Sequence, residues 1–381
     1  MAHPRISHRN GRRAALGMLA GVALLAGATP AKASAVPVRV PTPTGVWTGF
    51  DAWLGQRASA GEFSGTALVV RDGRVLLDAG YGLSDRASSV ADTPQTRYCV
   101  ASIGKLFTAV AVAQLVEQHR LSFTDPIGRY LTGFAPAVAD GVTVGDLLDM
   151  TSGLGDVVLG RPDPPATLAG MMQLIEAEPL QSQPGSSFLY SNDGYIVLGA
   201  LIEAVTGESY QRYVTGHVLA PSGMTHTSLT PYTPADVPGM AHGYALVGSG
   251  ATTPPVWQDV SNVPEPANPS GGAYSTAGDL ASFARALTDH RLLSPKMTAA
   301  VLTPRVASPQ PGGPPVDMYT YGFAYQALDG VTFVGHNGGT PGYGGQLDIY
   351  PQSGYVVVIL ANQDDALVPA IQKSEALITG A

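Results

Sequence analysis

The sequence predicts an α+β fold in which an antiparallel sheet is assembled from both ends of the chain and a helical lobe is inserted between its parts. Strand patterns fall near the beginning, at residues 65–80, and again at the end, at residues 331–360. Helical patterns occupy most of the chain between them. The length also exceeds what one typical hydrophobic core organises. We therefore expect a sheet lobe at about residues 36–96 and 265–381 and a helical lobe at about residues 97–264.

The first strand pair and the helix that follows it have clear sequence signals. Apolar residues at 65–70 and 74–80 flank a turn at residues 71–73, which suits a β-hairpin. An almost wholly apolar stretch begins at Ser102 and ends near residue 120, which predicts a buried helix. Further helices are expected at 142–150, at 167–176 and at 195–205, where Gly207 ends the last one.

The second half of the chain contains an irregular segment followed by a helix and three strands. Residues 231–270 are rich in Pro, Gly, Ser and Thr and predict a long surface excursion. Thr276 precedes an apolar pattern as a candidate N-cap. The remaining expected elements are a helix at 276–287, strands at 331–335, 345–350 and 355–360 with a turn at 351–354, and a terminal helix at about 366–378.

Residues 1–35 have the pattern of a signal peptide. Basic residues precede an apolar stretch at 14–28, and small residues at 31–35 suit a cleavage site. The apolar stretch is too short to cross a bilayer. Arg12 and Arg13 leave both general secretion and twin-arginine export open. We expect a secreted or periplasmic protein with no membrane anchor after cleavage.

The composition excludes several classes of function. The chain has 21 Lys and Arg against 29 Asp and Glu, so nucleic acid is not an expected partner. Cys99, the only cysteine, cannot form an intramolecular disulfide. The scattered histidines show no metal-ligand spacing, so we expect no metal and no cofactor. The expected partner is a small-molecule ester or amide or a peptide substrate, and a monomer is the default state.

Ser102 and Lys105 form the first candidate catalytic pair. Of the four lysines, only Lys105 has a serine three positions before it. Residues at i and i+3 share a helix face, so the amine can reach the hydroxyl. Burial would lower the pKa of the lysine and let it accept a proton, while the helix N-terminus favours a developing anion. Taken alone, the pattern also fits a serine cap and a solvated lysine.

Two further motifs follow in the chain. A Tyr-Ser-Asn tripeptide at 190–192 precedes the helix pattern at 195–205, and a His-Asn-Gly-Gly tetrapeptide at 336–339 follows the strand pattern at 331–335. In isolation, these fit a packed aromatic residue and a glycine turn. Together with Ser102 they favour acyl transfer, which needs a base near the nucleophile and donors aimed at the tetrahedral oxygen.

In this order, the three motifs resemble those of the serine β-lactamase and penicillin-binding-protein superfamily. The most similar branch is that of class C β-lactamases, DD-carboxypeptidases and family VIII esterases. The resemblance extends over nearly the whole chain after the signal peptide and implies a β-lactamase/transpeptidase-like fold. It rests on the stretches at 102–105, 147–154, 190–195, 271–280 and 335–339.

The resemblance implies a role for each matching residue. Ser102 would be the nucleophile that forms an acyl-enzyme, and Lys105 would assist the removal of its proton. Tyr190 would accept that proton, as a phenolate or through Lys105, and pass it to the leaving group. The residues expected to bind the substrate or its oxyanion are Asn192, His336, Asn337, Gly338 and the backbone N–H groups of Ser102 and Gly339.

The expected cleft strand departs from the family pattern. β-Lactamases of this branch carry Lys-Thr-Gly there, and that cation and hydroxyl engage a substrate carboxylate. This chain has His336, Asn337 and Gly338 instead. A neutral imidazole and an amide anchor a carboxylate less strongly. We therefore expect an exported serine hydrolase that acts on small esters or amides, with D-amino-acid peptides among the candidates.

Three alternatives stay open at this point. The first is a penicillin-interactive DD-peptidase or β-lactamase, and the second is an acyltransferase that uses the same acyl-enzyme. The third is a non-catalytic module that binds peptidoglycan or senses acylation.

Overall fold

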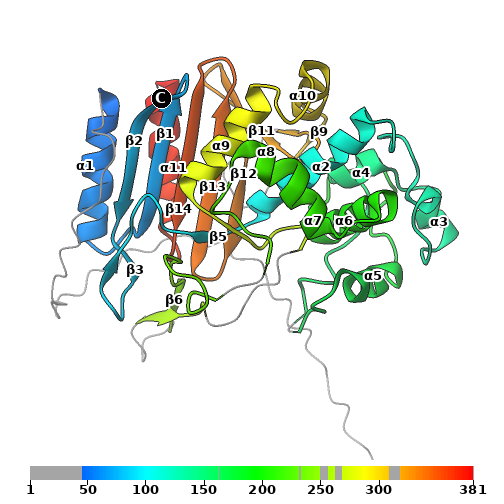
Figure 1. Cartoon of the computed structure of the whole chain (residues 1–381), viewed down its shortest axis with the longest axis horizontal. Coiled ribbons are helices and arrows are strands. Elements are labelled where there is room, and N and C mark those ends of the chain that lie inside the picture. Colours follow the sequence, from blue (N-terminus) through cyan, green and yellow to red (C-terminus); the bar gives the residue numbers. More distant parts are fainter. Residues whose placement is uncertain are drawn as a thin grey trace, which may run out of the picture.

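The computed structural model describes residues 45–161, 163–230, 233–248, 256–261, 268–308 and 318–380. Within these residues, an eight-stranded antiparallel sheet lies beside a group of helices, which confirms the predicted α+β fold (Figure 1). The predicted signal peptide lies outside the described residues. The sheet order is β2-β1-β14-β13-β12-β11-β10-β9. The strands are β1 (Gly65–Arg71), β2 (Arg74–Tyr81), β9 (Val306–Ala307), β10 (Met318–Tyr319), β11 (Ala324–Leu328), β12 (Val331–Thr340), β13 (Tyr343–Tyr350) and β14 (Tyr355–Ala361).

Distant parts of the chain meet inside this sheet. β1 pairs with β14 along its whole length, from Gly65 opposite Ala361 to Arg71 opposite Tyr355. The predicted hairpin of β1 and β2 is confirmed, with Arg71 opposite Arg74 at its turn. The sheet is therefore assembled from both ends of the described chain, as the sequence predicts.

Helices cover both faces of the sheet. α1 (Val46–Ser59) and α11 (Leu367–Thr379) pack on one face, whereas α9 (Ala277–Thr288) packs on the other. The alternation of side chains along β1 explains the two layers. Ala67 joins the apolar core of α1 and α11, and its neighbour Leu68 joins the core that includes α9.

A second group of helices continues the core beyond the sheet, and α3 to α7 lie on the right of Figure 1. α2 is buried almost all round, as its apolar sequence predicts, and it contacts α6, α7 and α10. The α-helix begins at Lys105, because residues Ser102–Gly104 form a single 3-10 turn, η1. The helices of this part are α2 (Lys105–Glu117), α3 (Pro136–Ala139), α4 (Val144–Leu148), α5 (Leu168–Glu176), α6 (Asn192–Thr206), α7 (Tyr210–Val214), α8 (Ala220–Ser222) and α10 (Pro295–Leu302).

Two predicted elements extend further than expected. The strand expected at 331–335 continues to Thr340, because Gly338 and Gly339 pair with Gly345 and Gly344 of β13. The glycines therefore form regular strand here and not a turn.

The helix expected at 195–205 begins three residues earlier, at Asn192. Ser191 caps it, and its hydroxyl accepts the N–H of Gly194 at 2.9 Å. Both extensions place motif residues on regular elements.

Short strand pairs complete the described structure. β5 (Tyr98–Ala101) pairs with β8 (Ala273–Ser275), and this pair leads directly into η1. The others are β3 (Leu83–Asp85) with β4 (Val90–Ala91), and β6 (Tyr244–Val247) with β7 (Val256–Asp259). Across the described ranges, no helix combines the length and the apolar character needed to cross a membrane.

Candidate active site

The turn that carries Ser102 is held between strand β5 and helix α2. Ala101, the last residue of β5, has φ 43° and ψ −128°, a conformation that costs energy for a residue with a Cβ. A Cβ added at Gly271 would lie 2.9 Å from the carbonyl carbon of Ala101, so only glycine fits beside this turn. The sharp change of direction presents Ser102 at the start of η1 and α2.

Lys105 lies fully buried behind Ser102. Its Nζ lies 3.1 Å from Ser102 Oγ, 2.6 Å from Asn192 Oδ1 and 2.7 Å from the carbonyl oxygen of Ser270. An amide oxygen and a carbonyl oxygen can only accept hydrogen bonds. When Lys105 is neutral, its two N–H bonds therefore point to Asn192 and Ser270, and its lone pair faces the Ser102 hydroxyl.

The pKa of Lys105 is low enough for a substantial fraction of this side chain to be neutral near pH 7. Burial lowers the pKa of Lys105 to about 7, and the Asp156 carboxylate opposes that shift. A base with a pKa near the working pH combines a substantial neutral fraction with adequate basicity.

Asn192 is oriented by Asp156. Asn192 Nδ2 donates to Asp156 Oδ2 at 2.9 Å, so its Oδ1 must face Lys105. Sequence patterns did not single out Asp156 or Ser270, which hold Asn192 and Lys105 in this arrangement. A backbone carbonyl such as that of Ser270 leaves no signature in side-chain motifs.

Tyr190 lies beside the same lysine. Lys105 Nζ is 4.8 Å from the centroid of the Tyr190 ring. Burial raises the pKa of the Tyr190 phenol, a hydrogen bond with the Ser102 side chain opposes this, and Asp156 adds to it. Tyr190 is therefore a neutral phenol at ordinary pH. A neutral phenol can donate a proton but is a weak acceptor.

The edge of β12 forms the opposite wall. β11 pairs with β12 only as far as Gly335, so the edge of β12 from residue 336 onward faces the turn that carries Ser102. A Cβ at Gly338 would lie 2.1 Å from the Val100 carbonyl oxygen and 3.1 Å from Ser102 N, whereas a Cβ at Gly339 would meet nothing within 4 Å. Gly338 thus permits close contact with the turn, and the site opens at Gly339.

His336 and Asn337 occupy different environments on this strand. Asn337 is exposed, whereas His336 is 2% exposed. His336 Nδ1 faces a backbone carbonyl oxygen, that of Asn337, so it carries the proton, and Nε2 accepts from the Tyr319 hydroxyl at 2.9 Å. Burial, with Lys105 as the second cause, lowers the pKa of His336 to about 3. The ring supports the wall from within as a neutral group, and contact of His336 with a substrate stays a prediction.

Three aspartates near the motifs form hydrogen bonds that hold neighbouring backbone or hydroxyl groups. Asp193 accepts from the backbone N–H groups of Val157 and Val158, at 2.5 and 3.2 Å. Asp149 accepts from the Thr151 hydroxyl at 2.7 Å. Asp279 binds the backbone N–H of residue 226 at 2.7 Å. These carboxylates order loops around the site.

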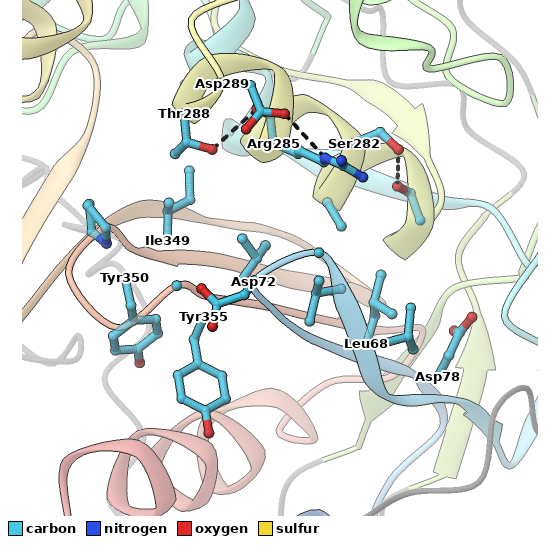
Figure 2. A pocket seen from close by; sticks show the side chains of 18 residues that line it. Leu68, Asp72, Asp78, Ser282, Arg285, Thr288, Asp289, Ile349, Tyr350 and Tyr355 are labelled. Atoms are coloured by element: carbon cyan, nitrogen blue, oxygen red, sulfur yellow. Dashed lines mark hydrogen bonds and ion pairs between the residues drawn. The ribbon is translucent and has the colours of Figure 1, made fainter. Parts of the chain in front are cut away.

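A cavity of about 520 Å³ lies away from these residues, between α9 and the end of the sheet. Figure 2 shows Arg285 of α9 and Asp289, which follows that helix, on one side and Asp72, Tyr350 and Tyr355 on the other. Arg285 Nε lies 3.2 Å from Asp289 Oδ2. None of the predicted catalytic or substrate-binding residues lines this cavity, so its size does not make it the reactive site.

A smaller cavity of about 210 Å³ adjoins the nucleophile segment. It is lined by Cys99 of β5, Tyr274 of β8 and Thr340 and Tyr343 beyond the glycines of β12, among others. Ser102, Lys105 and Tyr190 do not line this cavity either, although it lies against strands that flank the Ser102 turn.

The fold, together with a serine that contacts a buried lysine and a phenol, is that of a serine hydrolase. A family model described as Beta-lactamase matches residues 50–378. The chain is 32% identical over 298 residues to the putative penicillin-binding protein PbpX of Bacillus subtilis (strain 168), which is 78% of this chain and 70% of that protein. It is 28% identical over 312 residues to Protein flp of Staphylococcus aureus (strain COL), 80% of this chain and 60% of that protein.

A solved structure agrees with these matches. The penicillin binding protein from Bacillus halodurans superposes with a TM-score of 0.74 at 31% identity, covering 85% of this chain and 98% of that chain. The chain belongs to the Beta-lactamase family.

Proposed function

We propose that this protein is an exported serine hydrolase that cleaves small esters or amides, including peptides of D-amino acids, through an acyl-enzyme at Ser102. The observation that carries the proposal is the arrangement around Lys105. Two obligate acceptors, Asn192 and Ser270, occupy its N–H bonds and leave the lone pair for the Ser102 hydroxyl. Export rests on the signal pattern of residues 1–35.

The first chemical step forms the bond between Ser102 Oγ and the substrate carbonyl carbon. The hydroxyl proton passes to neutral Lys105, and the carbonyl electron pair moves onto oxygen. The N–H groups of Ser102 and Gly339 would stabilise that oxyanion at the open end of β12. When the tetrahedral intermediate collapses, the phenol of Tyr190 donates a proton to the departing alkoxide or amine and regains one from Lys105.

The second half of the reaction releases the acyl group. Water takes the place of the leaving group, loses a proton to the same Lys105 and Tyr190 system, and attacks the ester carbonyl. Collapse of this intermediate returns the proton to Ser102 Oγ and frees a carboxylic acid. An alcohol or amine acceptor in place of water would give acyl transfer.

The substrate class follows from the charge of the β12 wall. A buried, neutral His336 and an exposed Asn337 amide offer no cation to a substrate carboxylate at this strand. This favours neutral or cationic acyl groups over penicillins and over the carboxylate end of a D-Ala-D-Ala peptide.

A penicillin-interactive protein is the second candidate. Its support comes from two relatives at 31–32% identity, a putative penicillin-binding protein and a penicillin binding protein of known structure. An acyl-enzyme with penicillin would use the same Ser102, Lys105 and Tyr190.

Intact-mass analysis separates these candidates. The protein is exposed to p-nitrophenyl butyrate, a D-Ala-D-Ala peptide and a labelled penicillin, and the mass of the acyl adduct and its lifetime are recorded. We expect rapid acylation and turnover with the ester. Ser102→Ala should reduce acylation by more than about a thousandfold, whereas Ser59→Ala, which changes an exposed serine of α1, should have no effect. Adducts that persist in Ser102→Ala would overturn the assignment of the nucleophile.

A further inference from the structure

Asp156 places an exposed carboxylate next to the residues that surround the nucleophile. It lies on a loop that α6 holds in place. The Ser191 hydroxyl donates to the Gly155 carbonyl at 2.7 Å, and the Asp193 carboxylate accepts from the N–H of Val157 at 2.5 Å. The position of Asp156 is therefore set by backbone contacts on both of its sides.

Two hydrogen bonds connect the Asp156 carboxylate to Lys105 through the Asn192 side chain. Its Oδ2 accepts from Asn192 Nδ2 at 2.9 Å, and Asn192 Oδ1 accepts from Lys105 Nζ at 2.6 Å. Its second oxygen, Oδ1, makes no hydrogen bond to any described residue, and no described Lys, Arg or His forms an ion pair with it. Asp156 is an exposed residue, yet partial burial of its carboxylate raises the pKa, and the Asn192 hydrogen bond and Lys105 oppose that shift.

Asp156 also acts on the charges of the site. Its carboxylate is among the causes that raise the pKa values of Lys105 and Tyr190, so it lies within electrostatic range of both groups. A substrate carbonyl that reaches Ser102 must therefore approach a negative charge. His336 on β12 is neutral. Among the described residues, Asp156 is the exposed charged residue that hydrogen bonds connect to Ser102 most directly, through Asn192 and Lys105.

We propose that Asp156 recognises a substrate ammonium group close to the scissile carbonyl, as in an amino-acid amide, ester or peptide with a free α-amino group. This inference rests on the proposed acyl-enzyme chemistry and narrows its substrate class. The ammonium would donate to Asp156 Oδ1, the oxygen that Asn192 leaves free. An N-acylated substrate has no charge and lacks that interaction.

A purely positioning role for Asp156 makes a different prediction. If Asp156 only orients Asn192, its loss would disturb every substrate equally through Lys105. Asp156→Asn removes the charge and keeps an oxygen that can accept from Asn192 Nδ2. In a given variant, the ratio of the inhibition constants of an uncharged and a charged ligand separates the recognition of charge from any general loss of activity.

The test measures the inhibition of p-nitrophenyl acetate hydrolysis by phenylalanine amide and by N-acetylphenylalanine amide, in both the D and the L series. In the wild type we expect at least one free-amine ligand to bind about tenfold more tightly than its N-acetyl derivative. A tenfold difference lies between the effect of an exposed ion pair and that of a fully desolvated charge-assisted hydrogen bond. Asp156→Asn should bring that ratio close to one. Glu178→Gln, which neutralises an exposed carboxylate of the same lobe, should keep the wild-type ratio.

Two results would overturn the inference. One is a wild type in which neither free-amine ligand inhibits more strongly than its N-acetyl derivative. The other is a free-amine preference that survives in Asp156→Asn. The reporter ester makes failure of this inference distinguishable from failure of the proposed function. A wild type that does not hydrolyse p-nitrophenyl acetate contradicts the proposed hydrolase activity, independently of how the free-amine ligands bind.

Discussion

At the scale of single residues, Lys105 shows how burial changes the protonation of a side chain. A lysine in solution has a pKa near 10.4 and is protonated at neutral pH. Burial behind Ser102 lowers the pKa of Lys105 to about 7, and two acceptors direct its lone pair to the hydroxyl. The spacing of Ser102 and Lys105 in the sequence predicted this contact, because residues at i and i+3 share a face.

The lowered pKa of Lys105 predicts how activity depends on pH. Lys105 must be neutral to accept a proton, so kcat/KM for p-nitrophenyl acetate should rise about tenfold per pH unit below about pH 7 and level off above it. Initial rates from pH 5 to pH 9, corrected for spontaneous hydrolysis, measure this. Tyr190→Phe should lower the rate and keep the inflection, because burial moves the phenol pKa upward, away from this range. A flat profile would remove Lys105 as the base.

Other residues of the site could not be foreseen from sequence patterns. Ser270 acts through its backbone carbonyl, and that atom is common to every residue. Asp156 is recognisable only once the loop is folded onto α6 and its side chain meets Asn192. His336 belonged to a recognised motif, yet the pattern could not show that the ring is 2% exposed and bonded to Tyr319.

At the scale of elements, strand β12 shows why some boundaries were predictable and others were not. β14 is rich in β-branched residues and was expected almost where it occurs. β12 contains glycines at 338 and 339, which resemble a turn in sequence and form strand by pairing with β13. Helix α1 was missed although Trp47, Phe50 and Leu54 are buried at helical spacing, because Gly49 and Gly55 obscure the pattern. The lobe boundaries stay a prediction.

The two glycines of β12 make a matched pair for a test. In Gly338→Ala the new Cβ would fall 2.1 Å from the Val100 carbonyl oxygen, so β12 must move away from Ser102. We expect acylation by p-nitrophenyl acetate to fall at least about a hundredfold, because displacements of about 1 Å have effects of this size. Gly339→Ala places its Cβ in open space and retains the backbone N–H, so it should stay within about tenfold of the wild type. Circular dichroism and thermal unfolding would verify that both variants fold. Equal activities would show that close packing at 338 does not position the nucleophile.

At the scale of the whole molecule, the net charge of the protein and the charge near Ser102 both disfavour anionic ligands. The chain has a formal net charge of −8 at pH 7, and among the described residues the Asp156 carboxylate places an exposed negative charge near Ser102. A negatively charged protein repels anionic ligands at long range, and this repulsion weakens as salt shortens the Debye length from about 30 Å at 0.01 M to about 3 Å at 1 M. Anionic β-lactams should therefore be disfavoured before they reach Ser102.

This combination predicts both a substrate order and its salt dependence. kcat/KM for p-nitrophenyl acetate should exceed that for the anionic cephalosporin nitrocefin by about ten- to a hundredfold, the effect of one missing charge-assisted hydrogen bond to the substrate carboxylate. Raising NaCl from 0.02 to 0.5 M should speed the reaction with nitrocefin a few-fold and leave the neutral ester unchanged. Steady-state rates for both substrates in one buffer series provide the comparison, with the ester as the internal control. If nitrocefin reacts much faster than the ester and salt slows it, a cation must hold the β-lactam carboxylate, and the penicillin-interactive candidate becomes the better account of the site.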